Sequence, residues 1–242
     1  MSSVPGLVPY STSVPIVSLL VEKMRYQRVK QAVVTSARLF VENVKMHRVC
    51  MVTLTYRPGA VWSPKDITGF IRAARKYVQR RGSAVMRYVW VAEVQEQRAA
   101  ANLSDIVLHY HVLLWLPKGL TLPKPDKQGW WSRGSTRIEW ARRPIRYVLK
   151  YVSKIGAFDR VPKGARVVGV GGLNDLERAE RAWWRCPRWL RDETVIEDRP
   201  NRARGGGWVK RKTGEWLDSR YTFAGLACGG LVVMLIEKGV AL

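Results

Sequence analysis

Two of the three histidines in this 242-residue chain, His109 and His111, lie in one apolar run that extends from Ile106 to Leu116. The run is rich in leucine, β-branched and aromatic side chains and is followed by Pro117 and Gly119, which predicts a buried strand. Alternate residues of a strand face the same side, so we expect both imidazoles to point together. Hydrogen-bonding neighbours or a bound divalent metal ion would satisfy such a pair.

A second pattern begins at Pro144, a residue suited to the first turn of a helix. On that helix Tyr147 and Tyr151 are four positions apart, so their side chains would lie about 6 Å apart on one face. Lys150 and Lys154 each follow a tyrosine by three positions, which places an ammonium near each phenol. A nearby cation stabilises a phenolate and makes the phenol a better nucleophile. An amphipathic helix with buried tyrosines and solvated lysines would have the same spacing.

Together these motifs resemble the HUH endonucleases, in particular the two-tyrosine rolling-circle replication initiators of single-stranded DNA phages and related plasmids. A further family motif, an apolar-Thr-Leu-Thr strand ahead of the histidines, is similar to Val52-Thr53-Leu54-Thr55. The three motifs occur in the family's order between residues 48 and 155. Tyr110 is more polar than the usual residue between the histidines, and residues 96–105 form a longer insertion than is typical.

The resemblance implies a chemistry for these residues. A metal ion, Mg²⁺ or Mn²⁺, held by His109 and His111 would polarise the scissile phosphate while Tyr147 or Tyr151 attacks phosphorus. The products would be a 5′-phosphotyrosine and a free 3′-hydroxyl that can prime a polymerase. Two tyrosines would let cleavage and rejoining alternate. Lys150 and Lys154 would assist the tyrosines or bind phosphate, and because both lysines bracket Tyr151, we favour Tyr151 for the first cut.

The metal site would need a third protein ligand. Residues 85–95 predict a strand that pairs antiparallel with the histidine strand and carries Glu93 on an alternating face. A carboxylate oxygen suits Mg²⁺ or Mn²⁺, so Glu93 is our first choice. Gln95, Glu96 and Asp105 stay open as alternatives, because the pairing register cannot be derived from the sequence.

The predicted elements indicate an α+β fold in which helices flank a mainly antiparallel sheet with the His-x-His strand at its centre. Helices are predicted at 17–47, 64–81, from Pro144 onward and at 173–189, strands at 48–56, 85–95, 106–116, 136–140 and 165–172, and a hairpin at 205–221. We expect three parts. Residues 1–47 would be a lead-in with a basic amphipathic helix, 48–175 the endonuclease core, and 176–242 an extension that completes the fold or grips DNA.

The chain has 42 Lys and Arg against 19 Asp and Glu, a formal net charge of +23, which predicts a polyanionic partner. The basic residues are interleaved with aromatic ones throughout the chain, which favours nucleic acid over a membrane surface. Trp130 and Trp131, in a predicted loop, would either stack on bases or pack internally. The apolar stretch 223–236 is about fourteen residues long, whereas a membrane span needs about twenty, so we expect a buried element or a strand pair.

Three functions compete at this stage. The first is a replication initiator that nicks and rejoins single-stranded origin DNA; the second is a transposase or mobilisation relaxase with the same chemistry; the third is a non-catalytic nucleic-acid-binding protein. The paired Tyr-x-x-Lys pattern favours the first. The sequence has no phosphate-loop or helicase motif, so a host helicase and polymerase would be partners. Three unpaired cysteines and a start unlike a secretory signal predict the cytoplasm of a bacterial host cell.

Overall fold

The computed structural model describes residues 16–94, 108–154, 161–204, 206–228 and 232–237. The chain forms two compact units, one made of residues 1–25 with 200–242 and a larger one made of residues 26–199. The three-part division expected from the sequence stays a prediction.

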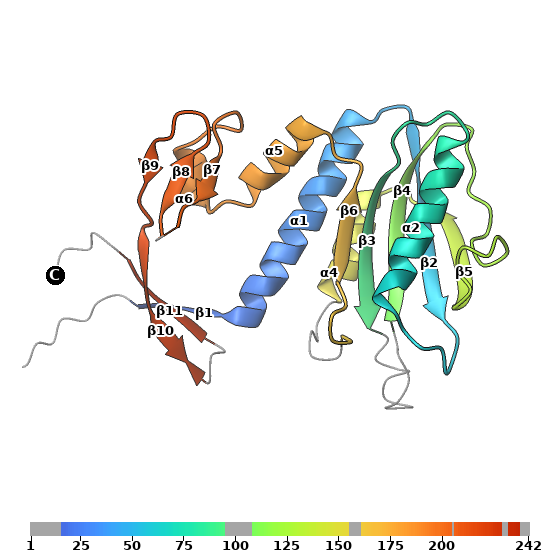
Figure 1. Cartoon of the computed structure of the whole chain (residues 1–242), viewed down its shortest axis with the longest axis horizontal. Coiled ribbons are helices and arrows are strands. Elements are labelled where there is room, and N and C mark those ends of the chain that lie inside the picture. The colour runs from blue at the N-terminus through green and yellow to red at the C-terminus, as the bar shows by residue number, and fades with distance from the viewer. Residues whose placement is uncertain (1–15, 95–107, 155–160, 205, 229–231, 238–242) are drawn as a thin grey trace, which may run out of the picture. The chain divides into compact units, whose positions relative to one another are not determined.

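The larger unit is built on a five-stranded sheet with the order β5-β2-β4-β3-β6 (Figure 1). Its strands are β2 (His47–Tyr56), β3 (Arg87–Val94), β4 (Leu108–Pro117), β5 (Gly134–Trp140) and β6 (Val168–Gly171). Every neighbouring pair is antiparallel, and the histidine strand β4 lies in the middle. The predicted α+β fold with a central His-x-His strand is therefore confirmed.

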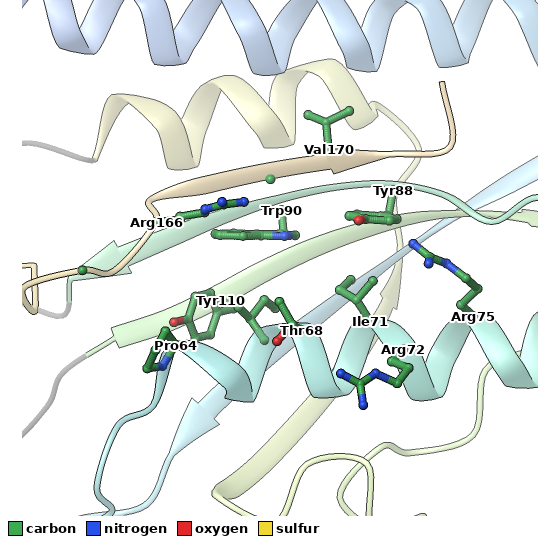
Figure 2. Close-up of a pocket in the computed structure, with 13 residues that line it drawn as sticks. Pro64, Thr68, Ile71, Arg72, Arg75, Tyr88, Trp90, Tyr110, Arg166 and Val170 are labelled. Atoms are coloured by element: carbon green, nitrogen blue, oxygen red, sulfur yellow. The ribbon is translucent and has the colours of Figure 1, made fainter. Parts of the chain in front are cut away.

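Helix α2 (Pro64–Gln79) covers one face of this sheet. It begins at a capping box, in which the Ser63 side chain accepts a hydrogen bond from the backbone and the Asp66 side chain accepts one from the Ser63 amide. Its apolar stripe packs on the inward residues of the strands; the buried members on α2 are Ile67, Phe70, Ile71, Ala74 and Val78. Tyr88, Trp90 and Tyr110 point from the sheet to the same side (Figure 2).

Helices α1 (Val21–Asn43) and α4 (Pro144–Ser153) cover the opposite face. The second core lies between them and the sheet; it includes Val33, Ala37, Phe40, Val148 and Val152 of the helices with Met51, Val89, Val91, Leu113 and Trp115 of the strands. Adjacent residues of β4 thus face different cores, as strand geometry requires. The tyrosine helix and the two histidines lie on one side of the sheet.

Two predicted helices differ from those in the structure. The predicted helix 17–47 begins only at Val21, because residues 16–20 form a strand that pairs with a distant one. The predicted helix 173–189 is divided into α5 (Asp175–Trp184) and α6 (Arg188–Asp192). Pro187 explains the break, because proline lacks an amide hydrogen and disfavours helical geometry in the residue before it.

The smaller unit contains two three-stranded sheets. One has the order β1-β11-β10, with β1 at Ile16–Leu20, β10 at Tyr221–Ala227 and β11 at Val232–Glu237. The other joins β7 (Pro200–Arg202), β8 (Trp208–Lys210) and β9 (Trp216–Leu217). The antiparallel pair β8–β9 confirms the predicted hairpin, and β10–β11 confirms a strand pair within 223–236. Within the part of the chain that the structure covers, no helix is long and apolar enough to cross a membrane.

Candidate active site

His109 and His111 lie on the face of β4 that α4 covers, with ring centroids 6.2 Å apart. His111 is buried and His109 is half-buried. The strands beside β4 bring further polar residues to the same end of this face. On β3, Glu93 is opposite His109, and on β2, Thr53 is opposite His111. The sheet therefore assembles polar side chains from three strands that are distant in sequence.

Glu93 connects the histidine strand to the tyrosine helix. Its Oε2 is 2.6 Å from Nε2 of His111, and its Oε1 accepts a hydrogen bond of 2.6 Å from Nζ of Lys154. Burial alone would raise the pKa of Glu93, but the hydrogen bonds and charges of His111 and Lys154 outweigh it and lower the pKa to about 2. Glu93 is thus an anion at neutral pH, held between a strand residue and a helix residue.

Thr53 contacts the other nitrogen of the same imidazole. Its Oγ1 lies 3.2 Å from Nδ1 of His111, so both ring nitrogens of His111 have a polar neighbour. Such a contact fixes the ring orientation and biases the tautomer, as partners of metal-binding histidines commonly do. The sequence places Thr53 in a recognisable strand motif, but only the register of β2 against β4 shows that it contacts His111.

Tyr151 lies directly on this cluster. Its ring stacks on His111 with a centroid separation of 3.5 Å and an interplanar angle of 13°. Lys150 and Lys154 have their ammonium nitrogens 5.6 and 5.8 Å from the Tyr151 ring centroid. Lys154 lowers the pKa of Tyr151 as expected, but burial and the charge of Glu93 are larger effects, so that the pKa of Tyr151 is raised. The predicted net activation of this phenol by lysine is not what the protein without metal or DNA displays.

Tyr147 has a different environment one turn earlier on α4. It is half-buried and lines a hollow of about 590 Å³. Basic side chains make up most of the other walls, which are formed by Trp140, Arg142, Arg143, Arg146 and Lys150. The two tyrosines share a helix, yet only Tyr151 contacts the His111 ring in the structure.

The donors expected for a metal ion are compatible with Mg²⁺ or Mn²⁺ in kind, since they are two imidazoles and one carboxylate on the same face of adjacent strands. His111 and Glu93 contact each other directly, so a bound ion would have to replace that hydrogen bond. Among the residues placed by the structure, no three His, Cys, Asp or Glu side chains form a group that could hold a metal ion. The alternatives Gln95, Glu96 and Asp105 lie outside the described residues. The metal ligands therefore stay a prediction.

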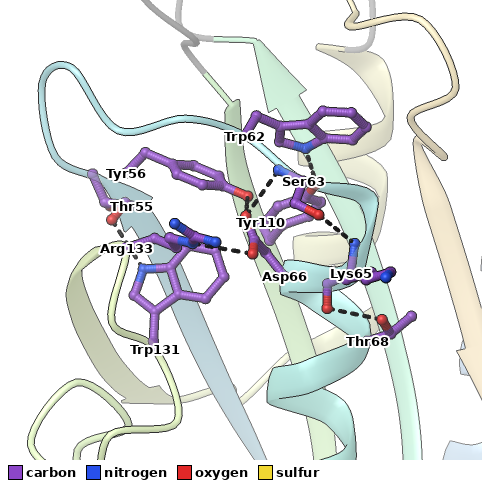
Figure 3. A network of polar contacts seen from close by, with 10 residues as sticks. All are labelled: Thr55, Tyr56, Trp62, Ser63, Lys65, Asp66, Thr68, Tyr110, Trp131 and Arg133. Atoms are coloured by element: carbon purple, nitrogen blue, oxygen red, sulfur yellow. Dashed lines mark hydrogen bonds and ion pairs between the residues drawn. The ribbon is translucent and has the colours of Figure 1, made fainter.

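A second polar cluster lies on the opposite side of the sheet and is centred on Asp66 (Figure 3). This carboxylate accepts hydrogen bonds from Tyr56 Oη at 3.0 Å, Arg133 Nε at 3.1 Å and the Ser63 amide at 3.0 Å. Burial, with a contribution from Asp66, raises the pKa of Tyr56 far above its usual range. These contacts join β2, the start of α2 and the segment before β5, which indicates a structural role.

The tryptophan pair in the loop packs internally. Trp131 is 1 % exposed and its Nε1 donates a hydrogen bond to the Thr55 carbonyl. Trp130 contacts Tyr77 edge to face, with a centroid separation of 5.2 Å. These contacts favour packing over the alternative prediction that the two rings stack on bases.

The site lies within a segment that resembles a known family. Residues 49–156 match the model of a family of replication-associated proteins that is named for ORF2. That segment contains β3, β4, β5, α4 and nearly all of β2, and so every residue of the candidate site. No curated protein and no solved structure gave a match. The match supports a replication initiator that binds DNA.

Proposed function

We propose that this protein starts rolling-circle replication by nicking single-stranded origin DNA with a tyrosine of α4. The observation that carries the proposal is the stacking of Tyr151 on His111, which already contacts Glu93 and, through it, Lys154. A nucleophile, an imidazole pair and an anionic side chain are thereby placed within reach of one phosphate group. The family match to residues 49–156 favours replication over transposition or mobilisation, which would use the same chemistry.

In the proposed step, the phenol oxygen of Tyr151 forms a bond to phosphorus and the bond from phosphorus to the 3′ oxygen breaks. The phenol gives up a proton and the departing 3′ oxygen takes one up, so a 5′-phosphotyrosine and a free 3′-hydroxyl result without net proton change. A Mg²⁺ or Mn²⁺ ion held by His109, His111 and Glu93 would supply a Lewis acid for the phosphate oxygens. Thr53 orients the His111 ring, and Lys154 orients Glu93.

Tyr147 would act in the opposite direction, at termination. Its basic hollow, with Arg143 and Arg146 among the lining residues, is suited to a DNA phosphate. After one round, attack by Tyr147 would release the strand held on Tyr151 by exchanging one phosphotyrosine for another. A host helicase and polymerase would separate and extend the strands in the cytoplasm of a bacterial cell.

The proposal is tested by incubating the full chain with origin-bearing single-stranded DNA and Mn²⁺ and then resolving protein from protein–DNA adduct on a denaturing gel. Tyr147→Phe and Tyr151→Phe should each leave part of the adduct, and the double variant should leave none. Phenylalanine keeps the packed ring and removes only the nucleophile. Tyr77→Phe, which removes a phenol on α2 that donates to the Thr121 carbonyl, is the matched control.

Mass spectrometry of the DNA-linked peptide identifies the attacked residue directly. An adduct on Tyr56, on Tyr110 or on any residue outside α4 would refute the two-tyrosine mechanism. If the wild-type protein binds the DNA but forms no adduct with any divalent ion, the non-catalytic alternative is correct.

A further inference from the structure

A hollow of about 560 Å³ lies on the face of the sheet opposite to His109 and His111. It lies between α2 and the edge strand β6 (Figure 2). Arg72 and Arg75 approach it from α2, and Arg166 approaches from the segment before β6. All its lining residues belong to the larger unit of the chain.

Two glycines of β6 shape the floor of this hollow. Gly169 pairs with Trp90 and Gly171 pairs with Tyr88 on the adjacent strand β3. A Cβ atom on Gly169 would lie 2.2 Å from Nε1 of Trp90, and one on Gly171 would lie 2.3 Å from Cε1 of Tyr88. The aromatic rings therefore occupy the space of the missing side chains, and glycine is required at both positions for the rings to lie across β6.

The three arginines supply a positive rim to this aromatic floor. Each is exposed, and none makes an ion pair or hydrogen bond with any residue whose placement the structure describes. A guanidinium without an acidic partner is available for a phosphate, which it can bind through two parallel hydrogen bonds. Because all three side chains are exposed, a DNA strand can reach them from solvent.

We propose that this groove, formed by Arg72, Arg75, Arg166, Tyr88 and Trp90, binds a stretch of single-stranded DNA away from the nicking site. The inference rests on the proposed function in taking DNA as the partner. Phosphates would contact the arginines and an unstacked base would contact the aromatic floor, the combination by which single strands are held without sequence preference. A strand held here is retained on the face of the sheet that carries no candidate nucleophile.

The test is fluorescence anisotropy of a labelled single-stranded oligonucleotide with the full chain over a range of salt concentrations. The groove variant combines Arg72→Gln, Arg75→Gln and Arg166→Gln. The charge-matched control combines Lys76→Gln, Arg80→Gln and Lys118→Gln, three exposed residues that do not line the hollow. Each lost phosphate contact on a single strand lowers the salt slope by about 0.7, so the groove variant should lose about 2 in slope and bind about tenfold more weakly. The control should change neither quantity as much.

Tyr88→Leu separates the two kinds of contact. It removes the aromatic ring and leaves the arginines, so we expect weaker binding with an unchanged salt slope. Its thermal unfolding is measured in parallel, since Tyr88 also packs against the core under α2. Equal affinity of the groove variant and the control would overturn the proposal. So would a deoxynucleoside monophosphate that binds as tightly as the oligonucleotide, because the groove would then hold a free nucleotide.

The covalent-adduct assay keeps this proposal distinct from the proposed function. At saturating DNA, the groove variant should form as much adduct as the wild-type protein, because the groove contains none of the nicking residues. If the wild-type protein forms no adduct, the nicking chemistry fails, yet the anisotropy comparison still decides the groove. If adduct forms normally and the groove variant binds like its control, only the groove assignment fails.

Discussion

The two faces of the central sheet each hold a carboxylate, a basic residue and a tyrosine, but the two sets are organised differently. On the α2 face, Asp66 accepts hydrogen bonds from Tyr56, Arg133 and the Ser63 amide, and the Tyr56 side chain is only 1 % exposed. On the α4 face, Glu93 contacts His111 and Lys154, and half-buried Tyr151 stacks on His111. The first set joins loops to the sheet, whereas the second places groups of different chemistry around one imidazole.

The difference teaches which tyrosines can attack a phosphate. Tyr56 and Tyr110 are buried within the sheet, and burial raises the pKa of both phenols. Tyr147 and Tyr151 lie on a helix whose lysines are exposed, so a DNA strand can approach them. Proximity to the histidine pair alone would not separate these groups, since Tyr110 is the residue between the two histidines. The face of the strand and the exposure of the phenol make the distinction.

The largest effect should follow removal of an imidazole from the α4 face. His111→Ala or His109→Ala should abolish adduct formation and leave most of the DNA affinity, because affinity comes mainly from many phosphate contacts. The measurements are the denaturing gel and fluorescence anisotropy. EDTA should inhibit the wild-type protein, and Mg²⁺ or Mn²⁺ should restore it. His47→Ala at the other end of the sheet is the control, and normal cleavage by His111→Ala would show that the site has been misassigned.

A strong effect should also separate the tyrosines of the two faces. Tyr151→Phe should remove most of the first-strand cleavage, because Tyr151 alone stacks on His111. Tyr56→Phe should leave the cleavage rate unchanged and reduce the free energy of unfolding by about 1 kcal/mol, through loss of its hydrogen bond to Asp66. Rate and stability are measured on the same preparations. A cleavage defect in Tyr56→Phe without loss of stability would break the comparison between the faces.

Much of the arrangement that underlies this comparison could be predicted from the sequence. Alternation along the strands placed His109, His111 and Glu93 toward a shared face, and the position of Ser63 predicted the start of α2. The stacking of Tyr151 on His111 could not be predicted, because it depends on how α4 packs against the sheet. The strand at residues 16–20 was missed for a related reason: its partner β11 is more than two hundred residues away, and local periodicity contains no information on it.

A moderate effect on stability should follow the loss of the carboxylate on the α2 face. Asp66→Ala removes the acceptor of three hydrogen bonds and half of the capping box, so we expect the free energy of unfolding to fall by roughly 2–4 kcal/mol. Urea unfolding measures the change. Cleavage at a temperature where the variant stays folded should be retained. Asp175→Ala, which removes an exposed carboxylate from the first turn of α5, should cost far less.

The smallest effect concerns Thr53, which touches the proposed chemistry only through His111. Thr53→Val keeps the shape of the side chain and removes the hydroxyl 3.2 Å from Nδ1 of His111. We expect about tenfold slower cleavage and a higher concentration of Mn²⁺ for half-maximal activity, since the partners of metal-binding histidines tune ligand orientation and basicity. Thr53→Ser, which restores a hydroxyl, should recover most of both quantities. A merely structural role would instead lower the unfolding midpoint and leave the metal requirement unchanged, and that pattern would separate Thr53 from the site that it borders.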